Sequence, residues 1–130
     1  SHSERGPAVV EIAGGAGVRV GAVATAAAAV CTATIAAVAG RLNYLASMQI
    51  TGLGATGATK VVATVTGLVG GTKSFAIAVP AGITTGITPI IVSFPVPVAA
   101  TGLNVAIVAS VPSFGAGNTD VDVNLDGFQT

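Results

Sequence analysis

Apolar and polar residues alternate with a period of two along most of this chain. In residues 60–66, Val61 and Val65 fall on one side of an extended chain while Thr64 falls on the other. A β-branched run of this kind favours a strand over a helix. Gly, Pro and Asn residues, which form turns, separate the alternating segments. The pattern predicts strands over residues 8–13, 18–23, 30–35, 41–51, 60–66, 72–79, 87–98, 104–111 and 119–125.

About eight strands at short intervals, with no convincing helical period, predict an all-β antiparallel sandwich or barrel. We expect residues 8–130 to form one domain, since this length supports a single core. Residues 1–7 are polar and predict an N-terminal arm that is flexible or docked on a partner. The arm residues that we expect to make partner contacts are Ser1, His2, Glu4, Arg5 and Pro7.

The sequence pattern makes more specific predictions for two of these strands. In residues 41–51, the alternation predicts that Tyr44, Met48 and Ile50 face the core. Pro95 and Pro97 cannot donate to a sheet ladder, so their strand is expected on a sheet edge or at a crossing between sheets.

Arg19 and Arg41 flank uncharged residues 20–40, a stretch long enough to span a bilayer. Alanine dominates this stretch and makes its free energy of insertion only marginal, so we expect no membrane partner. The conformation of the Ala-rich residues 22–30 stays open, because alanine favours a helix while residues 30–35 alternate as a strand does.

Charge is scarce: only 8% of the residues are charged, the formal net charge is zero, and the mean hydropathy is +0.85. No Asp or Glu lies between Glu11 and Asp120. Acid–base catalysis and hydrolytic triads need carboxylates or histidines, so the chain predicts no enzyme and no cofactor. Without a basic patch we also expect no nucleic acid partner. A surface this apolar predicts lasting contacts with other subunits.

Two motifs need separate interpretation. Residues 52–57 match the Gly-x-Gly-x-x-Gly fingerprint, but a strand follows in place of the required helix, so we interpret them as a glycine-rich hairpin connection. Cys31 lies among uncharged small residues and is expected to be a buried structural side chain.

The densest polar group lies near the end of the chain. On a strand, one face would carry four oxygen-bearing side chains, Asp120, Asp122, Asn124 and Asp126, and the other face Val121, Val123 and Leu125. The simplest interpretation is a terminal strand with a polar outer face. Cation binding between subunits and pairing with Arg5, Arg19 or Arg41 of a neighbouring subunit are the alternatives, with the four residues as weak metal candidates.

Several segments resemble small all-β virion proteins of tailed bacteriophages, of the capsid decoration and head-fibre type. They are residues 38–45 (VAGRLNYL), 94–97 (FPVP), 104–108 (NVAIV), 115–119 (GAGNT) and 123–128 (VNLDGF). The resemblance implies a β-sandwich with a jelly-roll-like fold and assembly into homo-oligomers, with a trimer favoured. It also implies a location on the capsid surface, with the major capsid protein or other virion subunits as partners and no catalytic residues. The alternative is a carbohydrate- or receptor-binding module of a head fibre or tail.

Overall fold

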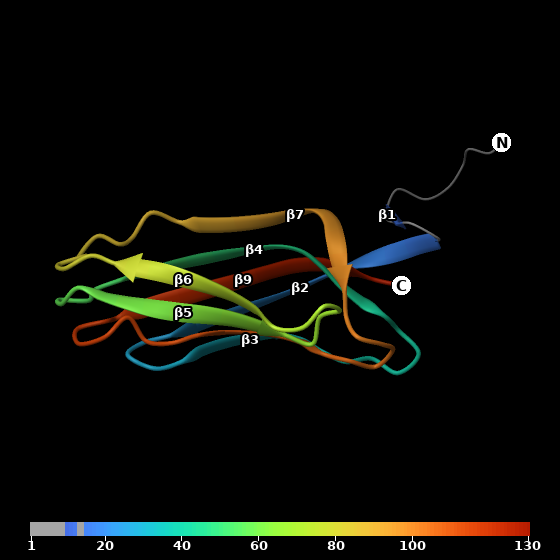
Figure 1. Ribbon diagram of the computed structural model, residues 1–130, viewed down its shortest axis with the longest axis horizontal. Helices are drawn as coiled ribbons and strands as arrows, with labels where there is room; N and C mark the ends of the chain where they lie inside the picture. Colours follow the sequence, from blue (N-terminus) through green and yellow to red (C-terminus); the bar gives the residue numbers. More distant parts are fainter. Residues whose placement is uncertain (1–9, 13–14) are drawn as a thin grey trace.

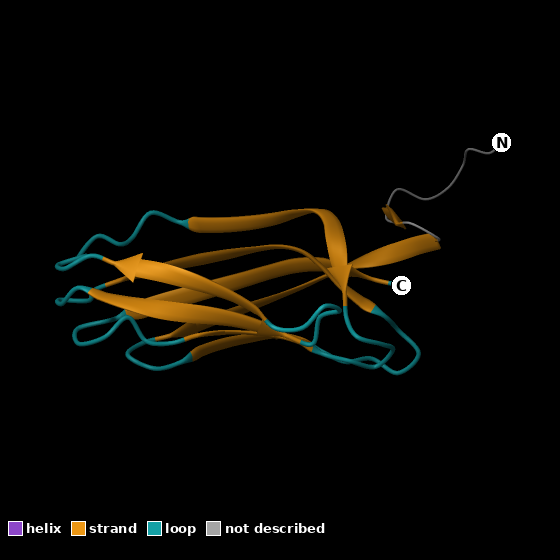
Figure 2. Cartoon of the chain, viewed as in Figure 1, coloured by secondary structure: helices purple, strands orange, loops and turns teal. Residues whose placement is uncertain are grey.

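The computed structural model describes residues 10–12 and 15–130, which form nine strands and no helix (Figure 1 and Figure 2). The strands are β1 (Val10–Ile12), β2 (Gly15–Ala26), β3 (Cys31–Ile35), β4 (Asn43–Leu53), β5 (Thr59–Thr66), β6 (Lys73–Val79), β7 (Ile90–Ala99), β8 (Ile107–Val111) and β9 (Asp120–Gln129). The described residues contain no helix that is long and apolar enough to cross a membrane.

The strands form two antiparallel sheets that pack face to face. One sheet has the order β1-β2-β9-β4-β7 and the other the order β3-β8-β5-β6. This arrangement confirms the predicted all-β antiparallel sandwich. It also confirms the edge position expected from Pro95 and Pro97, because β7 is the outermost strand of its sheet.

The pairing of the strands is nested. Strand β2 pairs with β9, β3 with β8, β4 with β7 and β5 with β6. The chain therefore resembles one long antiparallel ribbon, with its turn between β5 and β6, that has been folded across itself into two sheets.

The hairpin that we predicted at residues 52–57 is wrong, because β4 and β5 belong to different sheets. The glycines serve a close backbone crossing instead. Gly54 has a positive φ of 96°, and a Cβ there would meet the carbonyl oxygen of Gly117 at 2.6 Å. Gly52 and Gly54 therefore reflect close packing against the β8–β9 loop, whereas a Cβ at Gly57 would meet nothing within 4 Å.

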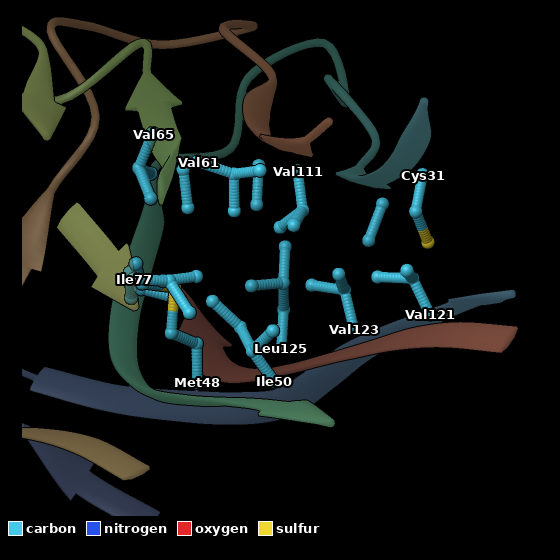
Figure 3. Packing of buried hydrophobic residues seen from close by; sticks show 14 of the residues in the cluster. Cys31, Met48, Ile50, Val61, Val65, Ile77, Val111, Val121, Val123 and Leu125 are labelled. Carbon is cyan, nitrogen blue, oxygen red and sulfur yellow. The ribbon is translucent and has the colours of Figure 1, made fainter. Parts of the chain in front are cut away.

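The core is an apolar layer between the sheets (Figure 3). Side chains from the four-stranded sheet, including Val61, Val65 and Val111, face side chains from β4 and β9. The largest side chains with less than 2% exposure include Phe114, Leu45, Met48, Ile50, Ile107 and Val121. Burial of such side chains is the main favourable contribution to folding, at roughly 25 cal/mol per Å² of apolar surface.

The N-terminal strands differ from the prediction. The predicted strands over residues 8–13 and 18–23 leave residues 14–17 for a glycine-containing turn between them, but Gly15 to Gly17 belong to β2 and pair with β1. Strand β2 then continues through Ala26, so most of the Ala-rich segment is extended, and the chain bends at residues 27–29. Cross-strand pairing with β9 overrides the helical propensity of alanine here.

The expected inward orientation of Tyr44 is wrong. A register shift between Leu45 and Ser47, against both β7 and β9, reverses the alternation within β4. Asn43 and Leu45 are buried before the shift, and Met48 and Ile50 are buried after it. The buried Asn43 amide donates to the carbonyl oxygens of Ala36 and Val105 at 3.0 Å and accepts from Gln129 at 3.0 Å, so its polar atoms are paired.

Gly127 lies opposite Leu45 at this register shift, and a Cβ there would overlap the carbonyl oxygen of Tyr44. We therefore expect Gly127→Ala to lower the free energy of unfolding by about 3 kcal/mol, measured by urea denaturation. The control is Gly57→Ala, where a Cβ meets nothing within 4 Å and the change is expected to stay within about 0.5 kcal/mol. Equal effects of the two substitutions would contradict this account of the bulge.

Candidate interaction surfaces

The polar residues near the end of the chain line the outer face of β9. Asp120, Asp122, Asn124 and Asp126 alternate with Val121, Val123 and Leu125, and the apolar residues are buried. Strand β9 lies between β2 and β4, so these four residues, the acidic stripe, run along the middle of the exposed sheet face. The predicted strand with a polar outer face is confirmed.

Neighbouring side chains on β2 contact the acidic stripe. The Thr25 hydroxyl donates to Oδ1 of Asp120 at 2.9 Å, and Nη2 of Arg19 lies 3.7 Å from Oδ1 of Asp126. The side chains of Arg19 and Asp126 are 72% and 48% exposed, so this ion pair contributes less than about 1 kcal/mol to stability. Arg19 therefore has a partner within its own chain, while Arg41 lies exposed in the β3–β4 loop.

The acidic stripe does not gather its oxygens around one point. Alternate residues of a strand lie about 7 Å apart, and a calcium ion needs ligands at about 2.3–2.6 Å. Within residues 10–12 and 15–130, no three His, Cys, Asp or Glu side chains are grouped so that they could hold a metal ion.

We expect millimolar Ca²⁺ to leave the midpoint of thermal unfolding unchanged, because the carboxylates of the stripe are too far apart to share an ion. The measurement is a thermal melt with Ca²⁺ and with a chelator. The same melts on Asp122→Asn provide the control. A rise in midpoint with Ca²⁺ that Asp122→Asn abolishes would show that the stripe holds an ion.

A second surface lies at one end of the sandwich. The C-terminal end, as we call it, consists of the β3–β4, β5–β6 and β7–β8 loops together with Thr130 (Figure 1). Backbone hydrogen bonds join these segments, from Val69 to Ala99, from Thr101 to Gly67 and from Asn104 to Arg41. The three loops therefore form a connected surface.

Each of these loops exposes a large apolar side chain: Val38, Val69 and Leu103. Val18 of β2 and Val96 of β7 are also exposed near this end. Five of the nine large apolar side chains that are exposed in the described residues therefore gather here. Arg41 is exposed in the same region. The C-terminal end combines apolar contact area with positive charge, which suits a protein partner that carries carboxylates.

The sequence pattern did not predict that these loop residues would be exposed together as a contact surface. Val69 precedes Gly70 and Gly71, and Leu103 follows Gly102, so both lie in turns. Leu68 and Ile83 also lie beside turn glycines but are buried, so the sequence carried no signal that separates exposed from buried apolar residues in these turns.

Cys31 is buried, as predicted, with 1% exposure. Desolvation raises the pKa of its thiol, and the negative charge of Asp122 adds to the rise. The thiol therefore stays protonated at neutral pH and is a poor nucleophile.

The predicted arm residues Ser1, His2, Glu4, Arg5 and Pro7 lie outside the described residues. Comparison of the chain with protein-family models and with curated proteins finds no match. Fold and surface chemistry are therefore the basis for inferring function.

Proposed function

We propose that this protein is a non-enzymatic structural subunit of a bacteriophage virion, a decoration protein that binds the capsid surface and stabilises it. The observation that carries the proposal is the C-terminal end, where three linked loops expose Val38, Val69 and Leu103 beside Arg41. In a chain with 8% charged residues, exposed apolar side chains gathered at one end favour a permanent contact with other subunits.

The topology supports this role. The nested pairing of β2 with β9, β3 with β8, β4 with β7 and β5 with β6 supports our proposal of a jelly-roll-like connectivity within the sandwich. Jelly rolls occur in viral capsid proteins, although they also occur in lectins and cupins. A fold supports several functions, so the surface and not the topology distinguishes among them.

The major capsid protein or another virion subunit is the proposed partner. Its binding surface would have an apolar centre to contact Leu103 and Val69, and a carboxylate to contact Arg41. Copies of this chain would also contact one another on the virion, and the resemblance to phage decoration proteins favours three copies.

The direct test is whether the protein is part of a particle. Tailed particles from the source of this sequence would be purified on a density gradient, and their proteins identified by mass spectrometry. We expect peptides of this chain to co-sediment with the major capsid protein. Absence of this chain from intact particles would overturn the proposal.

Leu103→Ser should weaken binding to particles that lack this protein by roughly tenfold, equivalent to about 1.4 kcal/mol, because it removes an apolar contact at the docking surface. The matched control is Ile91→Ser on the outer face of β7, since Ile91 is 65% exposed and Leu103 is 62% exposed. Co-sedimentation at increasing protein concentration measures both affinities. If the two variants bind equally well, the C-terminal end is not the docking surface.

Deletion of residues 1–7 tests the arm. We expect the truncated protein to keep the unfolding midpoint of the full chain and to bind particles more weakly, because an arm that orders on a neighbouring subunit adds contacts only in the assembly. If the truncated protein binds particles as tightly as the full chain does, the arm does not contribute to particle binding.

One observation favours the alternative of a carbohydrate- or receptor-binding module. Tyr44 and Phe128 lie directly opposite each other on the outer face of the five-stranded sheet, and Arg19 lies opposite Phe128 on the other side. Adjacent aromatic rings beside a polar side chain can stack on a sugar ring. Binding on a glycan array that Tyr44→Ala abolishes would favour this alternative over the decoration role.

A further inference from the structure

Strand β2 has a free edge along most of its length. Strand β1 pairs only with Gly15 to Gly17, whereas β9 pairs with residues 18–26 on the other side of β2. Within the part of the chain that the structure describes, the outer edge of residues 18–26 therefore has no neighbouring strand. Unpaired N–H and C=O groups at an edge can bind a further strand, and this stretch contains no proline that would prevent the pairing.

The core is also incompletely covered along this edge. The inward residues of β2, which are Val20, Ala22, Ala24 and Ala26, are only partly buried against the core. The inward residues of the neighbouring strand β9 are fully buried. A strand added beside β2 would remove more of this apolar surface from water, which favours association.

We propose that residues 18–26 pair with the same residues of a second copy, with the two β2 strands antiparallel about a two-fold axis. The register follows from the two ends of the free edge. Strand β1 occupies the edge before Val18, and the chain bends after Ala26. Pairing over the whole free length therefore places the two-fold axis at Ala22.

This register matches a projecting side chain to a hollow. Val23 would lie opposite Gly21 of the other copy, and both face outwards because they flank the inward residue Ala22. Val23 is 73% exposed, and Gly21 lines a hollow of about 300 Å³ together with Asn124 and Asp126. The Val23 side chain would pack over the hollow of the other copy, and the axis repeats this contact. The edge is therefore complementary to itself, as a two-fold interface requires.

Charge complementarity favours a second copy over an unrelated strand. In the same register, Arg19 would lie opposite Thr25 of the other copy, whose hydroxyl donates to Oδ1 of Asp120 at 2.9 Å. Strand β9 of the other copy is then two strand spacings away, about 10 Å, which the Arg19 and Asp120 side chains span together. A guanidinium has several N–H donors, so the contact of Arg19 with Asp126 of its own chain leaves donors for this second carboxylate.

The remaining carboxylates do not oppose the contact. The acidic stripes of the two copies would lie three strand spacings apart, about 14 Å, which exceeds the Debye length of about 8 Å at physiological ionic strength. The two Arg19 side chains would lie near opposite ends of the paired strands, about 20 Å apart. The attractive pairs of Arg19 with Asp120 are therefore the closest charge contacts between the copies.

This contact goes beyond the proposed virion role and does not depend on it, because it forms between isolated copies in solution. Self-association and particle binding are measured separately, so the failure of one proposal leaves the other standing. A two-fold contact is compatible with three copies around a three-fold axis on a virion, since some symmetric assemblies contain both kinds of axis.

Sedimentation equilibrium of the full chain tests the contact. We expect a dimer, and we expect Val23→Glu to weaken dimerisation by about tenfold or more, because it places a carboxylate beside Asp126 of the other copy. The matched control is Val96→Glu on the edge strand β7, since Val96 is 77% exposed, and this variant should dimerise as the unmodified chain does. A monomer at all concentrations, a trimer, or equal effects of the two substitutions would overturn the proposal.

The same measurement on a chain without residues 1–9 identifies another occupant of the edge. We expect this shortened chain to dimerise as the full chain does, because the paired residues are 18–26. If the full chain is a monomer and dimerises only after this deletion, the edge is covered by the chain's own N-terminal segment and the proposal is wrong.

Disulfide trapping tests the register independently of Val23→Glu. Cysteine is introduced at Ala22, on the axis, or at Ala24 as the control, in a Cys31→Ala background that removes the one native thiol. Two cysteines at Ala22 would have Cα atoms about 5 Å apart, which suits a disulfide, whereas two cysteines at Ala24 would be about 14 Å apart. We expect oxidation to cross-link only Ala22→Cys, as seen on a denaturing gel. Cross-links at neither position, or equally at both, would contradict this pairing.

Discussion

The rest of this structure depends on one interaction, which is the packing of apolar side chains from the two sheets against each other. Val121, Val123 and Leu125 of β9 point into the layer from one sheet, and Val61 and Val111 point into it from the other (Figure 3). Because side chains of a strand alternate between faces, fixing these residues inside forces the acidic stripe of β9 outside. By the same rule, the residues that enter the core determine which residues each sheet exposes to solvent.

Two polar side chains are buried at the ends of the sandwich, and both have hydrogen-bond partners. Buried Asn118 donates to the carbonyl oxygens of Leu53 and Asp120 at 2.8 and 3.0 Å, and it accepts from the backbone N–H of Phe114 at 3.3 Å. Phe114 is fully buried beside this turn. Asn43 joins segments at the opposite end in the same way. These two amides hold the loops that cross between the sheets, since an unpaired buried amide would be costly.

The surface is uneven in a way that composition alone does not reveal. Exposed apolar side chains gather at the C-terminal end, where the β3–β4, β5–β6 and β7–β8 loops are joined by backbone hydrogen bonds. These loops also expose Arg41, whereas the middle of the five-stranded sheet exposes the acidic stripe of β9. The apolar and the acidic surfaces of this weakly charged chain therefore lie on different parts of the molecule.

The sequence by itself determined the all-β class and most of the strands, because a period of two and turn residues act locally; residues 60–66 and the alternation of Asp120 to Asp126 are examples. It also limited β7 to a sheet edge or a crossing between sheets, since Pro95 and Pro97 cannot donate hydrogen bonds wherever the chain lies, and the structure places it at an edge. Tyr44 was misassigned because a bulge opposite Gly127 reverses the alternation, and that bulge depends on strands far away in the sequence. The tertiary structure alone decided which strands share a sheet and how Val38, Val69 and Leu103 meet at one end. Each of these depends on pairing between distant segments, and local propensity carries no information about such pairing.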